Sequence, residues 1–396
     1  MRLNKIKLTN FRCFSDFEVE FDPRLTVLTA INGHGKTSVL DAVKYALSCY
    51  IGRFPTLSQI RPEHWNIRSS IDEDGEHREE FCRIGAWGEF ESGASLNWNV
   101  QVQNRNLPKD VKVPPLADDI KELHAIVDRL AADRFGGGNA ALPVIAYYDT
   151  QRAVTTKVQR RRGFSSEFEY HEGYKGCLDA GLDFKVMLEW IEYFEKKEHD
   201  ECKKRQDITY ECIESQVIQR ALRTLMPELS NLRTEFGPYR LVVDANIDGN
   251  KTSCRVDEYL SDGYRIVLML VIDLISRILK LNPRSFESAE DVLACRGIVL
   301  IDEVDLHLHP SWQQRVLPDL LHVFPNIQFI VTTHSPQVVS TIPSRCVRKI
   351  DRYQVSPVAI NTEGALSGQV LSELASLSVD RMLKEYANGE VDEERP

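Results

Sequence analysis

The amino-acid sequence predicts an α/β fold that is built around a doubly wound sheet. Short apolar, β-branched runs recur along the chain, and one of them leads through a Gly-rich turn into a helical pattern. Other runs end in acidic residues or in a histidine. Continuous apolar runs suit central strands that are covered on both faces, whereas half-exposed strands alternate in polarity.

The first of these runs, residues 25–30, leads into a candidate phosphate-binding loop. The run is short and apolar, and residues 38–47 have the apolar spacing of a helix. A strand, a Gly-rich turn and a helix in this order are the context that such a loop requires. Backbone N–H groups of the turn and the helix N-terminus would wrap a β-phosphate. The candidate nucleotide-binding residues of the loop are Asn32, Gly33, His34, Gly35, Lys36, Thr37 and Ser38.

Two side chains of the loop have predicted chemical roles. Lys36 would reach the β- and γ-phosphates, and the Thr37 hydroxyl would ligate Mg²⁺. The loop departs from the pattern G-x-x-x-x-G-K-[ST] because Ala30 stands where the first glycine is expected. Alanine fits there only if its φ angle is negative, since a Cβ atom penalises the left-handed region. We therefore interpret the loop as a tolerated variant.

A second apolar strand, residues 298–301, ends in two adjacent carboxylates. Four apolar residues in a row suit a central strand. Asp302 can hold Mg²⁺, usually through water, because this ion keeps an octahedral shell of oxygens. Glu303 is then placed to polarise the attacking water. In isolation the pair would be ordinary solvated acids, but its position between the phosphate loop and residues 332–334 favours a catalytic site.

A third apolar strand carries His334 at its tip, directly after Thr332 and Thr333. A neutral imidazole there could hydrogen-bond the γ-phosphate or the lytic water and report whether the phosphate is present. A lone histidine at a strand end is more often structural. The order of the motifs along the chain favours the catalytic interpretation.

Ser261 and Gly263 precede a strongly apolar helix that is predicted over residues 264–279. A serine at a helix N-terminus is ordinarily an N-cap. In ATPases that sandwich nucleotide between subunits, the same N-terminus and hydroxyl bind the γ-phosphate that is held on the opposite protomer. The positive end of the helix dipole gives the physical reason.

In this order the motifs resemble the ABC-type ATPase head, a P-loop NTPase fold of SMC proteins, RecF and the double-strand-break repair ATPases. Residues 3–14 are similar to the first strand and the N-F-R-x-F turn of that group. Residues 302–310 resemble the D-E-x-[DE]-x-x-L-H-P form of small bacterial ATPases in the OLD, RecF and defence-associated groups. The chain looks closest to small anti-phage ATPases, such as the PtuA-like ATPase subunit of Septu and that of some retrons.

The resemblance implies ATP and Mg²⁺ as cofactors, and it assigns two further motifs. It places Ser261 and Gly263 on the signature motif and Asp305 near the D-loop. The signature departs from the family's L-S-G-G-Q at Asp262 and Tyr264.

Three more residues receive roles from the same resemblance. His334 corresponds to the switch histidine, and Arg12 would lie by the phosphates or the adenine. Gln151 follows a strand predicted over residues 143–148 and is the candidate for the glutamine that senses Mg²⁺ and the γ-phosphate.

Two smaller modules complete the predicted architecture. Residues 81–87 and 95–102 alternate in polarity, which predicts an antiparallel β lobe. The helical pattern between about 165 and 235 predicts a short helical-hairpin insertion, because too few residues are present for a long coiled-coil arm at about 1.5 Å each. We assign residues 1–150 to the N-terminal half of the head with the β lobe, 151–240 to the helical insertion, 241–345 to the C-terminal half, and 346–396 to a C-terminal extension.

Composition narrows the class of protein. Hydrophobic residues make up 42% of the 396 residues, as in ordinary globular proteins, and no uninterrupted apolar span could cross a bilayer. The first residues read as a strand, not as a signal peptide. Nine scattered cysteines without a C-x-x-C pair predict free thiols in a reducing cytoplasm. A net charge of −10 argues against a DNA-coating protein, although basic residues cluster at 157–162 and 196–205.

Three functions remain open on the sequence alone. The first is an ATP-hydrolysing switch that dimerises head-to-head over ATP and controls a separate nuclease or toxin in anti-phage defence. The second is a RecF- or SMC-like DNA-repair ATPase that acts directly on DNA. The third, a scaffold that holds nucleotide without turnover, fits the catalytic residues least well. Too little chain follows His334 for a nuclease domain, so we expect any nuclease to lie on another chain.

Overall fold

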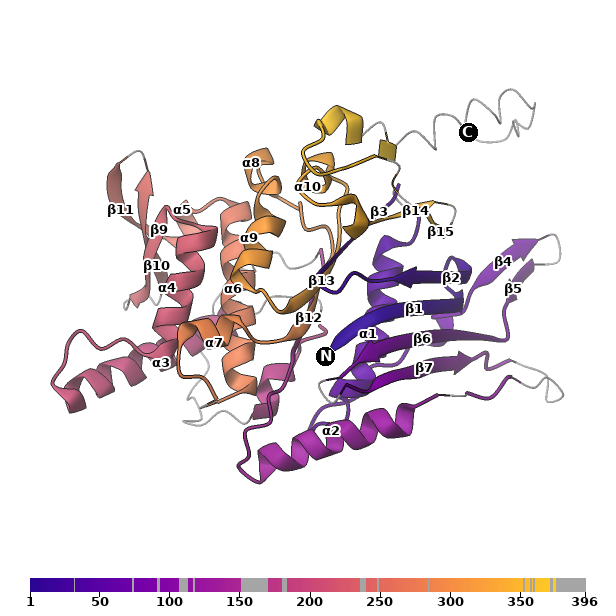
Figure 1. Ribbon diagram of the computed structural model, residues 1–396, viewed down its shortest axis with the longest axis horizontal. Helices are drawn as coiled ribbons and strands as arrows, with labels where there is room; N and C mark the ends of the chain where they lie inside the picture. Colours follow the sequence, from indigo (N-terminus) through magenta and orange to yellow (C-terminus); the bar gives the residue numbers. More distant parts are fainter. Residues whose placement is uncertain are drawn as a thin grey trace.

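The computed structural model is an α/β structure in which three larger sheets and their helices lie side by side, with a fourth, two-stranded sheet (Figure 1). The residues that it describes are 1–31, 33–72, 75–90, 93–106, 113–116, 118–150, 170–179, 184–235, 240–247, 249–283, 285–351, 353–356, 358, 360–370 and 373–374. The predicted basic cluster at 157–162 and the acidic C-terminal residues lie outside them.

A six-stranded, mostly parallel sheet forms the centre of the head. In spatial order its strands are β15 (Gln354–Ser356), β14 (Val347–Asp351), β3 (Leu25–Thr29), β13 (Ile327–Thr332), β12 (Gly297–Ile301) and β8 (Val144–Tyr148). All neighbours are parallel except β14 and β15. Every residue of β3, β8, β12 and β13 is buried, as the continuous apolar runs predict.

Helices cover both faces of this sheet. Helix α1 (Lys36–Ile51) lies on the side of the antiparallel lobe, and α6 (Asp262–Leu281) and α9 (Val316–Val323) lie on the other side (Figure 1). This arrangement confirms the predicted doubly wound head. The shorter helices are η1 (His64–Asn66), η2 (Tyr170–Tyr174), α5 (Val256–Tyr259), α7 (Ala289–Leu293), α8 (Pro310–Gln313), α10 (Pro336–Val339) and η3 (Ser344–Cys346). No helix in the described part of the chain is long and apolar enough to span a membrane.

The predicted antiparallel β lobe is present. Its strands are β2 (Phe14–Glu20), β1 (Arg2–Phe11), β6 (Phe81–Glu89) and β7 (Ser95–Gln103) in spatial order, with a separate hairpin of β4 (Ser69–Asp72) and β5 (Gly75–Arg78). Trp98 on β7 is fully buried, and its Nε1 donates to the Ala46 carbonyl of α1 over 2.9 Å. The lobe is therefore fixed directly to the helix that follows the phosphate loop. Helix α2 (Ile120–Phe135), which the sequence analysis did not predict, packs against α1 and β7.

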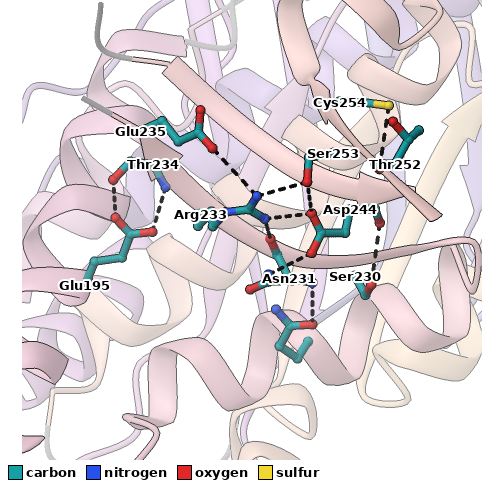
Figure 2. A network of polar contacts seen from close by, with 11 residues as sticks. Glu195, Ser230, Asn231, Arg233, Thr234, Glu235, Asp244, Thr252, Ser253 and Cys254 are labelled. Carbon is teal, nitrogen blue, oxygen red and sulfur yellow. Dashed lines mark hydrogen bonds and ion pairs between the residues drawn. The ribbon is translucent and has the colours of Figure 1, made fainter. Parts of the chain in front are cut away.

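The predicted helical hairpin is also present, as α3 (Phe184–Arg205) and α4 (Ile213–Leu225). It leads into a sheet that the sequence analysis missed, formed by β9 (Leu229–Glu235), β10 (Arg240–Ile247) and β11 (Asn250–Arg255). Asp244 on the middle strand accepts from Ser253 of β11 over 2.6 Å and from Arg233 of β9 over 2.9 Å (Figure 2). The hydroxyl of Ser253, with Asn231 and Arg233, lowers the pKa of Asp244 to about 2. The carboxylate therefore stays charged and joins all three strands.

A polar relay connects strand β8 with the middle of α6. The Tyr148 hydroxyl donates to Asp273 over 2.8 Å, and Arg277 Nε donates to the same carboxylate over 2.7 Å. Arg277 also donates to the carbonyls of Gly173 and Lys175 over 3.0 and 3.1 Å. Burial raises the pKa of Tyr148, so its hydroxyl stays neutral and acts as a donor. The relay fixes α6 against the central sheet.

The relay makes a prediction about stability. Replacing Asp273 with alanine should lower the free energy of unfolding by about 3 kcal/mol, because it leaves the largely buried Arg277 charge and the Tyr148 hydroxyl without their acceptor. Urea denaturation followed by tryptophan fluorescence measures the effect. Glu201→Ala, which removes an exposed ion pair with Lys204 on α3, is the control and should leave the midpoint nearly unchanged. Equal midpoints for the two variants would contradict a structural role for the relay.

Candidate nucleotide-binding site

The predicted site residues come from three neighbouring strands of the central sheet. The phosphate loop follows β3, Asp302 and Glu303 follow β12, and His334 follows β13. Since these strands are parallel, their carboxyl ends lie at one edge, where ligands of open α/β sheets bind. Segments that are about 270 residues apart in the chain therefore meet (from Lys36 to Asp302, 302 − 36 = 266).

The phosphate loop has the backbone that its glycines permit. Gly33 and Gly35 have φ angles of 82° and 90°, in the left-handed region. A Cβ atom on Gly35 would also lie 2.5 Å from the Phe14 ring and 2.8 Å from the Cys13 sulfur, so the loop has no room for a side chain there. Ala30 does not have a positive φ, as its tolerance required.

Lys36 is buried within the loop. Its ammonium donates to the Ala30 carbonyl over 3.0 Å, which holds the side chain across the turn. Burial lowers the pKa of Lys36, while the carboxylates of Asp302, Glu303 and Asp305 oppose that shift. The Lys36 ammonium therefore lies near the acids that follow β12. A bound phosphate would lie between this cation and those carboxylates.

Asp302 is the central acceptor of the site and is 2% exposed. Its Oδ2 accepts from the Thr37 hydroxyl over 2.9 Å, and its Oδ1 accepts from the Thr332 hydroxyl over 2.5 Å. The Thr332 oxygen in turn accepts from the backbone N–H of Glu303 over 2.7 Å. One carboxylate thus joins the phosphate loop, β12 and β13.

The same oxygens fit Mg²⁺. A P-loop Mg²⁺ takes one hydroxyl and one or two carboxylates and completes its octahedron with phosphate and water oxygens. Thr37 Oγ1 and Asp302 Oδ2 supply a hydroxyl and a carboxylate oxygen 2.9 Å apart. These two residues would hold the ion when nucleotide is bound, and the ion would neutralise charge on the phosphates.

Glu303 sits at a sharp turn of the backbone. Its φ angle is +47°, which is uncommon for a residue with a Cβ atom and ends the strand abruptly. Two bonds to β13 hold this turn, from Glu303 N to the Thr332 hydroxyl and from Val304 N to the Thr332 carbonyl. Two residues on, Asp305 accepts from the Thr333 hydroxyl over 2.5 Å. The predicted base is therefore aimed by its backbone and not by its side chain alone.

His334 follows these threonines and is partly exposed. Partial burial lowers its pKa below the ordinary value, and the Lys36 cation lowers it further, whereas Asp305, Glu303 and Asp302 oppose the shift. The imidazole is therefore neutral at pH 7 and can accept a hydrogen bond. This is the protonation state that the sequence analysis required for sensing a phosphate.

Arg12 lies at the first turns of α1. Its Nη1 donates to Asp41 over 2.7 Å and to the Ser38 hydroxyl over 3.3 Å. These contacts fix the guanidinium beside the last residue of the phosphate loop, and its role toward nucleotide stays a prediction.

Ser261 and Gly263 lie at the start of α6. Ser261 is exposed and occupies the N-cap position, but its hydroxyl does not cap the helix. A Cβ atom on Gly263 would lie 2.7 Å from the His307 carbonyl, so the glycine allows α6 to pack against the segment that follows Glu303. The first turn of the helix therefore has N–H groups that the Ser261 hydroxyl does not cap.

Two predicted residues, Asn32 and Gln151, lie outside the described part of the chain, so their roles stay predictions. Sequence reasoning did not assign a role to Thr332, which the structure places between Asp302 and Glu303. Its position at the carboxyl end of a strand beside β12 was the available signal. The register that pairs Ile301 with Val331, one residue before it, appears only in the fold.

Comparison with known proteins identifies the relatives of this chain. A model described as an AAA domain matches residues 5–234, which is more than half of the chain, and a second AAA-domain model matches residues 213–340. The “Retron Ec83 probable ATPase” of Escherichia coli is 27% identical over 98% of this chain and 80% of its own length.

Two further relatives extend this picture. The “Retron Vc95 probable ATPase” of Vibrio cholerae serotype O1 biovar El Tor is 24% identical over 98% of this chain and 83% of its own length. The “Septu protein PtuA” of Bacillus mycoides (strain KBAB4) is 44% identical over 20% of this chain and 10% of its own length. These matches confirm the resemblance that the sequence analysis drew to retron ATPases and to PtuA.

The position of Thr332 generates a prediction about activity. Thr332→Val keeps the shape of the side chain but removes the donor to Asp302 and the acceptor for Glu303 N–H. ATP turnover should fall by about 10- to 100-fold, as for other residues that orient a metal ligand. Phosphate release at saturating ATP and Mg²⁺ measures it. Thr332→Ser keeps both bonds and should retain most activity, and a fully active valine variant would refute the orienting role.

The charges around His334 generate a second prediction. In Lys36→Met the pKa of His334 should rise, because a nearby cation that disfavours the imidazolium is lost. In Asp305→Asn it should fall, because a nearby anion is lost. Titration of the His334 ring by NMR, without nucleotide, gives both values. Shifts in the same direction for the two variants would show that the histidine does not sense this cluster.

Proposed function

Because the chain belongs to the AAA-domain family, we propose that it is an ATPase switch that sandwiches ATP in a head-to-head dimer and controls a separate effector protein. ATP hydrolysis is the enzymatic activity of this family. The dimer and the effector are the parts that we add. The proposal rests on two groups of residues on one subunit. One group follows the strands of the central sheet, and the other lies at the N-terminus of α6.

One place gathers the proposed residues for phosphate binding, metal binding and cleavage. It holds Lys36 and Thr37 on the loop, Asp302 and Glu303 after β12, and His334 after β13. A phosphate in this position would have a cation, a metal site and a candidate base around it. It needs one more set of donors to enclose the γ-phosphate on its solvent side.

The other place offers such donors. Ser261 and the first turn of the 20-residue helix α6 present a hydroxyl, free N–H groups and the positive end of a helix dipole. A second copy that brings this turn over Lys36 and Thr37 would complete the site. The energy of binding ATP is then also energy of dimer closure, and a ligand shifts that equilibrium only by its preference for the closed form.

The effector follows from the relatives. The chain aligns over 98% of its length with two ATPases that are named for retrons, and locally with the Septu protein PtuA. We propose that this chain acts in the same setting, anti-phage defence, and that closing and opening of the dimer controls a nuclease or toxin on another chain. Mg²⁺ supports ATP binding at Thr37 and Asp302.

The proposal predicts opposite effects for two substitutions. Lys36→Ala should abolish tight ATP binding, because it removes the cation that reaches the β- and γ-phosphates. Glu303→Gln should bind ATP but not cleave it, so ATP-bound dimers should accumulate. Light scattering after size-exclusion chromatography with ATP and Mg²⁺ measures the dimer. Glu201→Gln on exposed α3 is the matched control, and unchanged ATP turnover in Glu303→Gln would remove this residue from the role of base.

The shared site predicts complementation between two inactive chains. A Lys36→Ala chain lacks a phosphate loop, and a Ser261→Arg chain lacks the signature. In a mixed dimer both lesions fall on one composite site, so the other site is intact. The mixture should recover part of the ATPase activity, measured as phosphate release with mixed dimers confirmed by affinity tags. Mixed dimers that are no more active than either variant alone would refute a signature that acts in trans.

A further inference from the structure

Trp65 is an exposed aromatic residue beside the nucleotide site that no motif explains. It lies on η1 and is 56% exposed, whereas Trp98 of β7 is fully buried in the core. Its Nε1 donates to Glu63 over 3.2 Å. Its ring offers a large apolar face to solvent.

The backbone around Trp65 is fixed to strand β1. Arg12 N donates to the Asn66 carbonyl over 2.8 Å, and Phe11 forms an isolated β-bridge with Ile67. These bonds on the residues that follow Trp65 fix η1 to the turn after β1. The ring is therefore presented by a rigid element and not by a mobile loop.

Arg12 connects this ring with the phosphate loop. The centre of its guanidinium lies 5.0 Å from the Trp65 ring and 5.3 Å from the Phe11 ring. Its Nη1 binds Ser38 and Asp41 on the first turns of α1. Trp65, Arg12 and Ser38 thus form a continuous path from an exposed aromatic face to the last residue of the loop.

This path leads away from the end of the loop that takes the terminal phosphates. If Lys36 reaches the β- and γ-phosphates and Thr37 faces the metal position at Asp302, the α-phosphate and the nucleoside would lie on the other side of the loop. Ser38 and Arg12 are the next polar groups in that direction. An exposed aromatic ring just beyond an α-phosphate is placed to meet a base.

We propose that Trp65 stacks on the base of the bound nucleotide and that Arg12 fixes the position of the Trp65 ring relative to the phosphate loop. The proposal rests on the proposed function in one respect, that the phosphate loop binds ATP. Base–aromatic stacking contributes roughly 1–3 kcal/mol per base, so the exposed face of Trp65 would supply a large part of nucleoside affinity. The guanidinium on its other side adds a cation–π contact that keeps the ring in place.

Tyr353 is the competing candidate for the same role. It is 41% exposed, lies on the turn between β14 and β15, and its ring centre is 6.1 Å from His34 and 5.8 Å from Phe14. It therefore borders the part of the loop before Gly35, whereas Trp65 borders the part after Thr37. The two positions predict different sides for the base.

The test compares ADP with inorganic pyrophosphate, which differ by the nucleoside and are not substrates for hydrolysis of a γ-phosphate. Calorimetry with Mg²⁺ gives the Kd of each for wild type, Trp65→Ala, Trp65→Phe and Tyr353→Ala. In Trp65→Ala the Kd of ADP should rise by about tenfold and that of pyrophosphate should stay the same. Trp65→Phe keeps a ring and should restore most of the affinity for ADP.

Trp87 supplies the matched control. It also lies under a cation, with the Lys5 ammonium 4.4 Å from its ring, but it belongs to the middle of β6. Trp87→Ala should bind ADP and pyrophosphate as wild type does. A change in Trp65→Ala that Trp87→Ala shares would reflect the β lobe as a whole and would overturn the proposal.

Other outcomes also overturn it. Trp65 does not stack on the base if the Kd of ADP is unchanged in Trp65→Ala. The same holds if Trp65→Ala weakens pyrophosphate binding as much as ADP binding, or if only Tyr353→Ala weakens ADP binding. A loss of affinity for a single-stranded oligonucleotide with the Kd of ADP unchanged would also overturn the proposal, since the ring would then serve nucleic acid.

The two proposals can fail separately. If Trp65→Ala weakens ADP binding as expected but Glu303→Gln forms no ATP-bound dimer, the proposed switch is wrong and the stacking role of Trp65 stands.

Discussion

The hydrogen bonds of the Asp302 carboxylate hold the nucleotide site together. One oxygen accepts from Thr37 of the phosphate loop and the other from Thr332 of β13, and the residue itself ends β12. In a 2% exposed position each lost bond would remove a donor from a buried carboxylate, which is costly in a low dielectric. The three strand ends are therefore held in one arrangement, and Glu303 and His334 take their places from it.

The same constraint reaches the rest of the head through α6. The helix is fixed at its middle by Asp273, which accepts from Tyr148 at the end of β8 and from Arg277, and at its start by the close approach of Gly263 to the His307 carbonyl. His307 follows Glu303 by four residues. The position of the first turn of α6 thus depends on the strands that carry Asp302 and Glu303, which is the coupling that the proposed shared site requires.

The antiparallel lobe completes the site from the other side. Cys13 and Phe14 fill the space that the missing side chain of Gly35 leaves, and Trp98 binds the backbone of α1. The turn between β1 and β2 carries Arg12 to the first turns of α1. The lobe is therefore a wall of the nucleotide site, and its exposed tryptophan, Trp65, lies where that wall ends.

Strands β3, β8, β12 and β13, the loop after β3 and the order of the motifs could be predicted from the sequence alone, because continuous apolar runs, glycines and adjacent acids are local patterns. Sheet β9–β11 and helix α2 were missed; β9 and β11 are polar and mostly half-exposed or exposed, so their alternation is weak. The partners of Thr332 and Arg277 and the exposure of Trp65 appear only in the folded chain. Thr332 and Arg277 form hydrogen bonds with residues that are distant in the chain, and strand register and packing decide those bonds. The exposure of Trp65 also depends on packing, so the residues next to it in the sequence do not predict it.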